Sequence, residues 1–459
     1  MSVRRRLLTG LGLALVTLVY LATMPTQRSM NDVESAAVAG WRYATTGGMS
    51  LDGLDLHRLG TLSDGAADWL WVTTGAGGHQ VISRSPGVMV ASVPAYWLWA
   101  HLGGHGSAPE QFSLVPAQVT AVLLTVAALA LLWLALEGLV GTATRTLAVA
   151  ALACATPVWT VAAGGLYTHS IDLLGIGGMA WAARRERWWL VGVFGGGALW
   201  GRLHMALVVA VVGLTMAVVR RRPAIAVRVG LPSLLLMGLA ALFSHAVYGH
   251  WTPAGGYRTA DQYAAGVVRT DHLSQLRTYA GLLIAPDRGL LVWSPVLLLL
   301  PLAIGRVWRS APAWTRALAV GGLAYLVVQG LLDGFSGGSG YFGYRLTLEP
   351  LGCAFPLLVL AATRMGPVAR ALIGPLLGLQ TGAFAIGAVS HGFFVLPQDV
   401  WRDNSIWLAV RTFPSIGAFL VLTTLVGYLA GRVWRERGID TGVSGAPAAA
   451  APSAPAARR

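Results

Sequence analysis

The run SLVPAQVTAVLLTVAALALLWLALE, residues 113–137, decides the fold class of this chain. A helix needs roughly 20 apolar residues to cross the hydrocarbon core of a bilayer, and the only charged residue in this run, Glu137, ends it. Similar runs recur along the 459 residues, of which 55% are hydrophobic and 11% charged. Soluble domains carry roughly 25% charged residues. The pattern therefore predicts an all-α polytopic membrane protein.

The basic residues set the predicted topology. The formal net charge is +14, and the chain has no lysine, so arginine supplies every fixed positive charge. The arginines form short clusters between apolar runs, which is typical of cytoplasmic loops and not of a continuous nucleic-acid-binding surface. We therefore expect no nucleic-acid partner. The clusters are Arg4/Arg5/Arg6, Arg184/Arg185/Arg187, Arg220/Arg221/Arg222, Arg306/Arg309, Arg364/Arg370 and Arg432/Arg435/Arg437.

If every cluster is cytoplasmic, the chain has about twelve transmembrane helices and both termini lie inside. The first apolar segment has a poor cleavage site, so we interpret it as an uncleaved helix rather than a signal peptide. The spans are predicted near 7–23, 113–137, 146–163, 167–183, 188–201, 204–219, 227–248, 289–305, 314–332, 348–363, 368–390 and 407–431. Residues 1–437 would form one membrane domain, and the Ala/Pro-rich residues 438–459 a disordered cytoplasmic tail. The Ala/Gly-rich, lysine-free composition indicates a GC-rich bacterium, hence a bacterial plasma membrane.

Residues 24–112 are predicted to form one long extracytoplasmic loop. Its apolar run SPGVMVASVPAYWLWAHLGG, which begins at Ser85, would place the next basic clusters on the wrong side if it crossed the membrane. The run contains two prolines and an aromatic end that suits the membrane interface. We therefore expect residues 86–103 to lie in the interface rather than to span.

Polar residues gather at helix ends that this topology places outside. Asp32 and Glu34 follow the first helix, and His169 and Asp172 are three residues apart, so they share one helix face. The other candidates on this side are Arg202, Tyr257, Arg258, Asp287, Arg288, Tyr344 and Arg345. Charges at the edge of the hydrocarbon are costly and are usually retained for a site or a pathway.

Arg345 has the most informative surroundings. It lies in GGSGYFGYRLTLEPL, residues 337–351, where a Gly-rich segment opens a helix, and a guanidinium beside free N–H groups suits phosphate binding. The pair His169/Asp172 could equally cap its helix or contact an acceptor. Asp287 and Arg288 could form a local ion pair. Because the chain has no P-loop or dinucleotide fingerprint, any chemistry is expected outside, without a nucleotide donor.

The order of these features resembles the GT-C glycosyltransferases, membrane enzymes that use polyprenyl-phosphate sugars. The acid pair in the first loop, the interfacial run and the many-helix bundle are all similar to that superfamily. GLLIAPDRGLLVWSPVLLLL, residues 281–300, and the segment 337–351 resemble two of its bacterial motifs. The resemblance covers most of residues 7–363 but indicates no particular subfamily.

The resemblance implies roles for individual residues. Asp32 matches the catalytic base, Glu34 the second acid, and Arg345 the arginine that binds the lipid phosphate. Apart from the resemblance, the chemistry of a phosphate leaving group leads us to expect Arg258 or Arg288 as an assisting cation. His169, Asp172, Arg202, Tyr257 and Tyr344 are expected to line the substrate site. Some members bind a divalent cation such as Mg²⁺ or Mn²⁺, and here only Asp32 and Glu34 could hold it. The chain departs from many relatives by reading Asn-Asp-Val-Glu instead of a doubled acid, which leaves the metal open.

The expected reaction is transfer of a sugar from the lipid phosphate to a glycan, lipid or protein acceptor. A single displacement with a carboxylate as general base would invert the anomeric centre. Two alternatives belong to other classes: a transporter or flippase, and a noncatalytic subunit of an envelope-synthesis complex. A transporter predicts ionisable residues at mid-depth along a path, and a noncatalytic subunit predicts that Asp32 and Arg345 lie far apart.

Overall fold

The computed structural model describes residues 3–26, 30–59, 70–256, 272–332, 334–338 and 340–436. Helices dominate this part of the chain, which confirms the predicted class of an all-α protein except for one small sheet. The first helices are α1 (Val3–Ala22), α2 (Asn31–Thr46), α3 (Leu56–Leu59), α4 (Pro86–Ala91), α5 (Val93–Gly103), α6 (Val115–Ala135) and α7 (Thr142–Cys154). They are followed by α8 (Thr168–Arg184), α9 (Trp188–Gly201), α10 (Met205–Val219) and α11 (Ala224–Tyr248). The last are α13 (His272–Ile284), α14 (Leu290–Trp293), α15 (Pro301–Trp308), α16 (Ala313–Leu332), α17 (Leu348–Ala362), α18 (Pro367–Ser390), α19 (Ser405–Thr412) and α20 (Ser415–Glu436).

Within these described ranges, five helices are long and apolar enough to cross a membrane, namely α6, α11, α16, α18 and α20. Shorter apolar stretches of 10–17 residues lie in α1, α7, α9, α10 and α17. The chain is thus a helical membrane protein by the length and composition of its helices. The number of twelve crossings stays a prediction.

Three of the predicted spans are interrupted, each beside a proline. Residues 289–305 form α14, a 3₁₀ turn at Pro295–Leu299 and then α15. Residues 407–431 divide into α19 and α20 at Pro414, and residues 146–163 into α7 and a π-helical turn at Val158–Ala162. Proline has no backbone N–H and clashes with the preceding turn, which favours a break, but Pro232, Pro356 and Pro375 lie inside continuous helices, so packing also decides where the backbone breaks.

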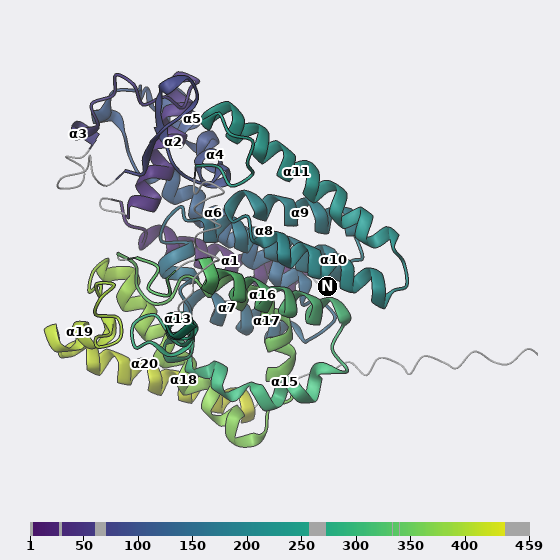
Figure 1. Ribbon diagram of the computed structural model, residues 1–459. Coiled ribbons are helices and arrows are strands. Elements are labelled where there is room, and N and C mark those ends of the chain that lie inside the picture. Colours follow the sequence, from purple (N-terminus) through teal and green to yellow (C-terminus); the bar gives the residue numbers. More distant parts are fainter. Residues whose placement is uncertain are drawn as a thin grey trace, which may run out of the picture.

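The segment between α1 and α6 folds into a small lobe, which we call the N-terminal lobe (residues 30–59 and 70–112). It contains α2–α5 and an antiparallel pair of strands, β1 (Val72–Thr74) and β2 (Gln80–Ile82), with Thr73 opposite Val81. This hairpin is the exception to the all-α prediction. The apolar core of the lobe lies around Trp41, Met89 and Tyr96 and is shared with Ala117 of α6 and Tyr248 of α11, all buried. Its place beside the end of α11 is visible at the upper left of Figure 1.

The run that was expected to lie in the interface is not one helix. It breaks at Ser92 into α4 and α5, which have 6 and 11 residues. Neither helix reaches the roughly 20 residues needed for a span. On α5, Trp97 and Leu102 are exposed while Tyr96 is buried, so the helix has one free apolar side. Which side of a membrane the lobe occupies stays a prediction.

Glycines allow neighbouring helices to approach closely. A Cβ on Gly374 of α18 would lie 2.4 Å from the carbonyl oxygen of Gly427 in α20, and one on Gly427 would lie 2.3 Å from that of Gly374. These helices run side by side at the lower left of Figure 1. A Cβ on Gly192 of α9 would meet the carbonyl oxygen of Val229 in α11 at 2.3 Å. Small residues at crossings are typical of packed membrane helices.

Candidate functional site

The structure brings Asp32 together with two arginines from distant parts of the chain. Oδ1 of Asp32 accepts a hydrogen bond from Nη1 of Arg84 at 2.9 Å, and Oδ2 accepts one from Nη1 of Arg345 at 2.8 Å. The indole N–H of Trp71 also donates to Oδ1, at 3.1 Å. Asp32 is 8% exposed and Arg84 3%, so this ion pair is largely withdrawn from solvent. We call Asp32, Arg84, Arg345 and Trp71 the Asp32 site.

Local structure fixes each member of this site. Asp32 lies in the first turn of α2, where the helix dipole favours a negative charge. Arg84 lies in the short link between β2 and α4. The backbone N–H of Trp71 donates to Oγ of Ser35, one turn further along α2, at 2.9 Å. The hairpin of the N-terminal lobe therefore carries both Trp71 and Arg84 onto α2.

The surroundings favour the charged form of Asp32. Burial alone would raise the pKa of this carboxyl, but the neighbouring guanidinium groups of Arg84 and Arg345 outweigh burial and hold its pKa well below the usual range. Glu34 is also buried, at 7% exposed. Residues two apart on a helix do not face each other, so Glu34 and Asp32 point to different sides of α2.

A glycine-rich segment shapes the backbone around Arg345. Gly337, Gly338, Gly340 and Gly343 all have positive φ, between 61° and 92°. A Cβ on Gly337 would lie 2.9 Å from Oη of Tyr341 and 3.2 Å from Nε of Arg345. The ring of Tyr341 lies 4.9 Å from the Arg345 guanidinium. Glycine is therefore required at Gly337, both for the backbone conformation and for space.

Arg288 makes hydrogen bonds to the backbone of the same glycine-rich segment. It is 2% exposed, and its Nη1 lies 2.5 Å from Oδ2 of Asp287. Its guanidinium also donates to the carbonyl oxygens of Tyr341, Gly343 and Val395 at 3.1–3.4 Å. Burial raises the pKa of Asp287. These contacts give Arg288 a positioning role for the backbone that leads to Arg345.

A second polar cluster is buried where the N-terminal parts of α8 and α17 meet the C-terminal ends of α9 and α16. Nδ1 of His169 lies 2.6 Å from Oε1 of Glu349. Nε of Arg202 lies 3.9 Å from both Asp172 and Glu349, and Nη1 donates to Oε1 of Gln329 at 2.6 Å. We call these five residues the buried cluster. His169, Asp172 and Glu349 are each 0% exposed.

The buried cluster adjoins the Asp32 site through Tyr167. The Tyr167 ring lies 5.8 Å from the Arg345 guanidinium and 6.2 Å from the His169 ring. His169, Asp172 and Arg202 were predicted to line a substrate site, and the structure brings them together. They contact one another and Glu349 and Gln329, and Nε of Arg202 also donates to Oγ1 of Thr168 at 2.9 Å.

The remaining predicted residues are placed as follows. Tyr344 is buried beside α14 and α18, with its Oη 2.9 Å from Oγ of Ser294, and it does not contact Asp32. Tyr257 and Arg258 lie outside the described residues. Sequence reasoning missed Arg84 and Trp71. A signal for Arg84 existed, because an arginine in a loop predicted to be extracytoplasmic departs from the positive-inside pattern.

The residues at the Asp32 site do not fit a divalent cation. Both carboxylate oxygens of Asp32 already bind guanidinium groups, and two fixed positive charges would repel a metal ion. Glu34 points to another side of α2. Over the described ranges, no group of three or more His, Cys, Asp and Glu side chains has a geometry that could hold a metal.

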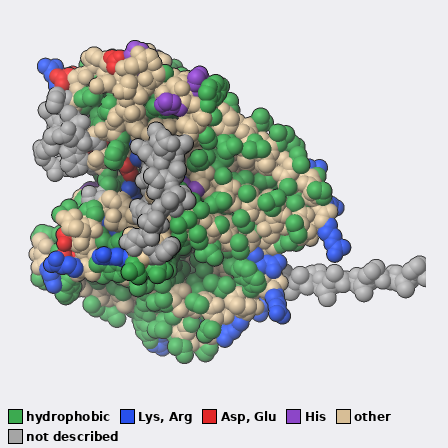
Figure 2. Space-filling view, viewed as in Figure 1, with side chains coloured by type: hydrophobic (Ala, Val, Ile, Leu, Met, Phe, Trp, Pro, Cys, Tyr) green, Lys and Arg blue, Asp and Glu red, His purple; other side chains and the backbone are tan. Residues whose placement is uncertain are grey.

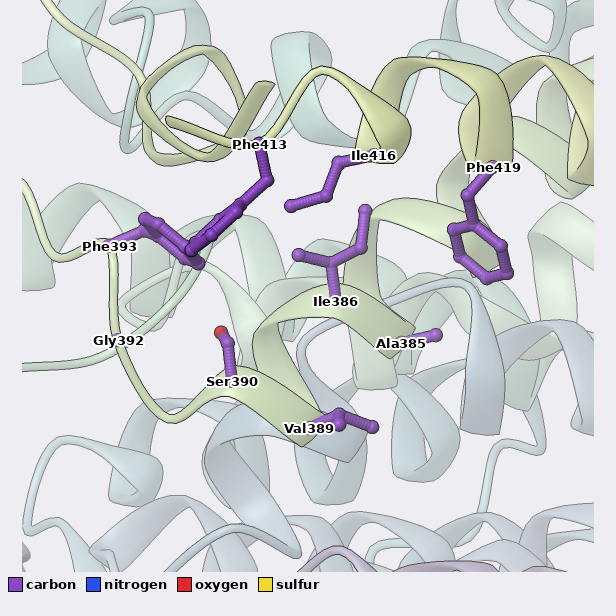
Figure 3. A pocket seen from close by; sticks show the side chains of 9 residues that line it. All are labelled: Ala385, Ile386, Val389, Ser390, Gly392, Phe393, Phe413, Ile416 and Phe419. Carbon is purple, nitrogen blue, oxygen red and sulfur yellow. The ribbon is translucent and has the colours of Figure 1, made fainter. Parts of the chain in front are cut away.

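An apolar cavity of about 600 Å³ lies elsewhere, between α18 and α20. Figure 3 shows Ile386 of α18 and Ile416 of α20 facing each other across it, with Phe393 and Phe413 closing one end. Its lining includes no residue of the Asp32 site.

Comparison with known proteins found no matching family model, no matching curated protein and no matching solved structure. The function is therefore argued from the site itself.

Proposed function

We propose that this protein is a membrane glycosyltransferase that moves a sugar from a polyprenyl-phosphate carrier to an acceptor hydroxyl on the extracytoplasmic face. The observation that carries the proposal is the contact of Asp32 with Arg345 and Arg84. One carboxylate and two guanidinium groups meet at one place, although Arg345 is 313 positions from Asp32 in the chain. These groups can supply a base and bind an anionic leaving group.

The chemistry assigns one task to each charge. The oxygen of the acceptor hydroxyl attacks C1 of the sugar, and the bond from C1 to the phosphate oxygen breaks. Asp32 takes the hydroxyl proton, and the polyprenyl phosphate departs with an added negative charge. Arg345 and Arg84 stabilise that charge as it develops. A single displacement of this kind inverts the anomeric centre.

The distribution of charge supports an asymmetric membrane protein. In Figure 2 arginine side chains line the lower right edge, where no acidic side chain is visible, whereas the visible acidic side chains lie toward the left with arginines beside them. The N-terminal lobe is on that left side, as Figure 1 shows. In our proposal the arginine-rich ends face the cytoplasm of a bacterium and the lobe faces outward.

A donor screen tests the proposal. Purified protein would be incubated with polyprenyl-phosphate sugars and a panel of glycan, lipid and peptide acceptors, and the release of free polyprenyl phosphate would be measured. We expect release with at least one donor, dependent on protein. No release with any donor and acceptor would count against catalysis.

The buried cluster favours a second candidate, a transporter or flippase, because buried ionisable groups in membrane proteins often mark a pathway. His169 and Glu349 belong to first helical turns, and Asp172 lies three residues after His169, so these residues are near helix ends rather than helix centres, which fits a site near one surface better. Reconstituted liposomes separate the two candidates. A flippase moves fluorescent polyprenyl-phosphate lipid between leaflets without breaking the sugar–phosphate bond.

A further inference from the structure

The contacts of Asp32 conflict with its proposed task as a base. Each carboxylate oxygen accepts a hydrogen bond from a different arginine, and Trp71 adds a third at Oδ1. Charge-assisted hydrogen bonds of this kind are strong. A carboxylate held in this way has a low affinity for a proton, and the acceptor hydroxyl would have to compete with two guanidinium groups for its oxygens.

The same two arginines form a suitable binding site for a phosphate. Guanidinium groups match the oxygens of phosphate as well as those of carboxylate. Arg84 comes from the N-terminal lobe and Arg345 from the segment before α17, and one anion already bridges them. A phosphodiester in this place would offset one of the two positive charges, and the second negative charge that the phosphate gains as the sugar leaves would offset the other.

We propose that the donor phosphate displaces the carboxylate of Asp32 from Arg84 and Arg345, so that binding of the donor also releases Asp32 to act as the base. This inference rests on the proposed function. Before the donor binds, the carboxylate of Asp32 occupies the site on Arg84 and Arg345 that the phosphate takes later. It also sets an order of events, because the base becomes available only when a donor is present.

The inference predicts that removal of the Asp32 carboxylate strengthens the binding of the lipid phosphate instead of weakening it. Asp32→Asn removes the competing anion, so it should bind a short-chain polyprenyl phosphate about tenfold more tightly than the wild type does. Glu34→Gln is the matched control, because it removes a second buried carboxylate of α2 that points to another side of the helix than Asp32. We expect its affinity to change by less than about threefold. The uncharged polyprenol controls for binding of the chain alone.

The affinities can be measured by calorimetry on the full-length protein in nanodiscs. Equal affinities of Asp32→Asn and Glu34→Gln would overturn the inference while leaving the proposed function intact. If the wild type and all variants failed to bind polyprenyl phosphate, the proposed function would fail, and the inference with it.

A measurement on the wild type avoids dependence on the folding of Asp32→Asn. Infrared difference spectra recorded on addition of polyprenyl phosphate should show a shift in a carboxylate stretching band, since one carboxylate loses two arginine partners. Glu34→Gln should retain this band shift. A spectrum without any carboxylate change, at saturating lipid, would overturn the inference.

Discussion

Oδ2 of Asp32 and Nη1 of Arg345 lie 2.8 Å apart, although 313 residues separate them in the chain. The contact joins the first turn of α2, in the N-terminal lobe, to the glycine-rich segment before α17. Arg84 completes it from the other side of the carboxylate.

Arg84 should be as important for transfer as Arg345. Arg84→Ala removes one of the two groups that stabilise the leaving phosphate, so we expect kcat for sugar transfer to fall about 100-fold. Arg58→Ala is the control, because Arg58 lies in the same lobe with a 67% exposed side chain in surface ion pairs with Asp55 and Glu110. Such pairs contribute about 0–1 kcal/mol. Equal activity of the two variants would contradict a role for Arg84.

Sugar transfer should depend more on the backbone conformation of the glycine-rich segment before α17 than on the flexibility of that segment. Gly337→Ala puts a methyl group 2.9 Å from Oη of Tyr341 at φ +61°, so it should displace Arg345 and lower transfer at least tenfold. Gly334→Ala is the matched control three residues earlier, where a Cβ meets nothing within 4 Å. Initial rates and thermal unfolding of both variants provide the test. A Gly337→Ala protein with the activity of Gly334→Ala would show that this backbone does not position Arg345.

The buried cluster should contribute to stability. His169→Ala leaves Glu349 without its 2.6 Å partner in a fully buried place, and a buried acceptor that loses its hydrogen bond costs about 1–3 kcal/mol. We therefore expect a lower unfolding temperature in detergent. His79→Ala, which removes a 2.6 Å contact between His79 and Asp52 at the exposed surface, is the comparison and should change little. A His169→Ala protein as stable as His79→Ala would refute a structural role for the pair.

The stability that Asp32 contributes should depend on pH in one direction. Its pKa in the folded protein is depressed, so its contribution is fully present above the pKa of the unfolded chain, about 3.9, and is lost as the pH falls through the folded value. The difference in unfolding temperature between wild type and Asp32→Asn should therefore stay constant from pH 7 to pH 5 and narrow below about pH 4. A gap that narrowed near pH 6 would show that the carboxyl is not held in its charged form.

Much of the helical architecture could be predicted from hydrophobic run lengths. The ranges predicted for α9, α16 and α17 differ from the observed helices by at most one residue at either end. The interruptions could not be predicted with the same ease. Apolar runs such as that at Pro295 and Pro301 are compatible with a kinked span, and only packing decides where the backbone breaks.

The candidate site was predictable in part. Asp32 and Arg345 were singled out, but their contact depends on tertiary structure. Arg84 was missed because it immediately precedes the apolar run from Ser85 and belongs to no motif. The hairpin that carries it has strands of three residues each, too short for a clear alternation of polar and apolar side chains.

The measurement that tests the account most directly is release of polyprenyl phosphate by Asp32→Asn under conditions in which the wild type is active. The amide keeps the shape of Asp32 but accepts no proton at neutral pH, so we predict that transfer falls by at least 100-fold while the protein remains folded. Near-wild-type release by a folded Asp32→Asn protein would contradict the assignment of Asp32 as the base.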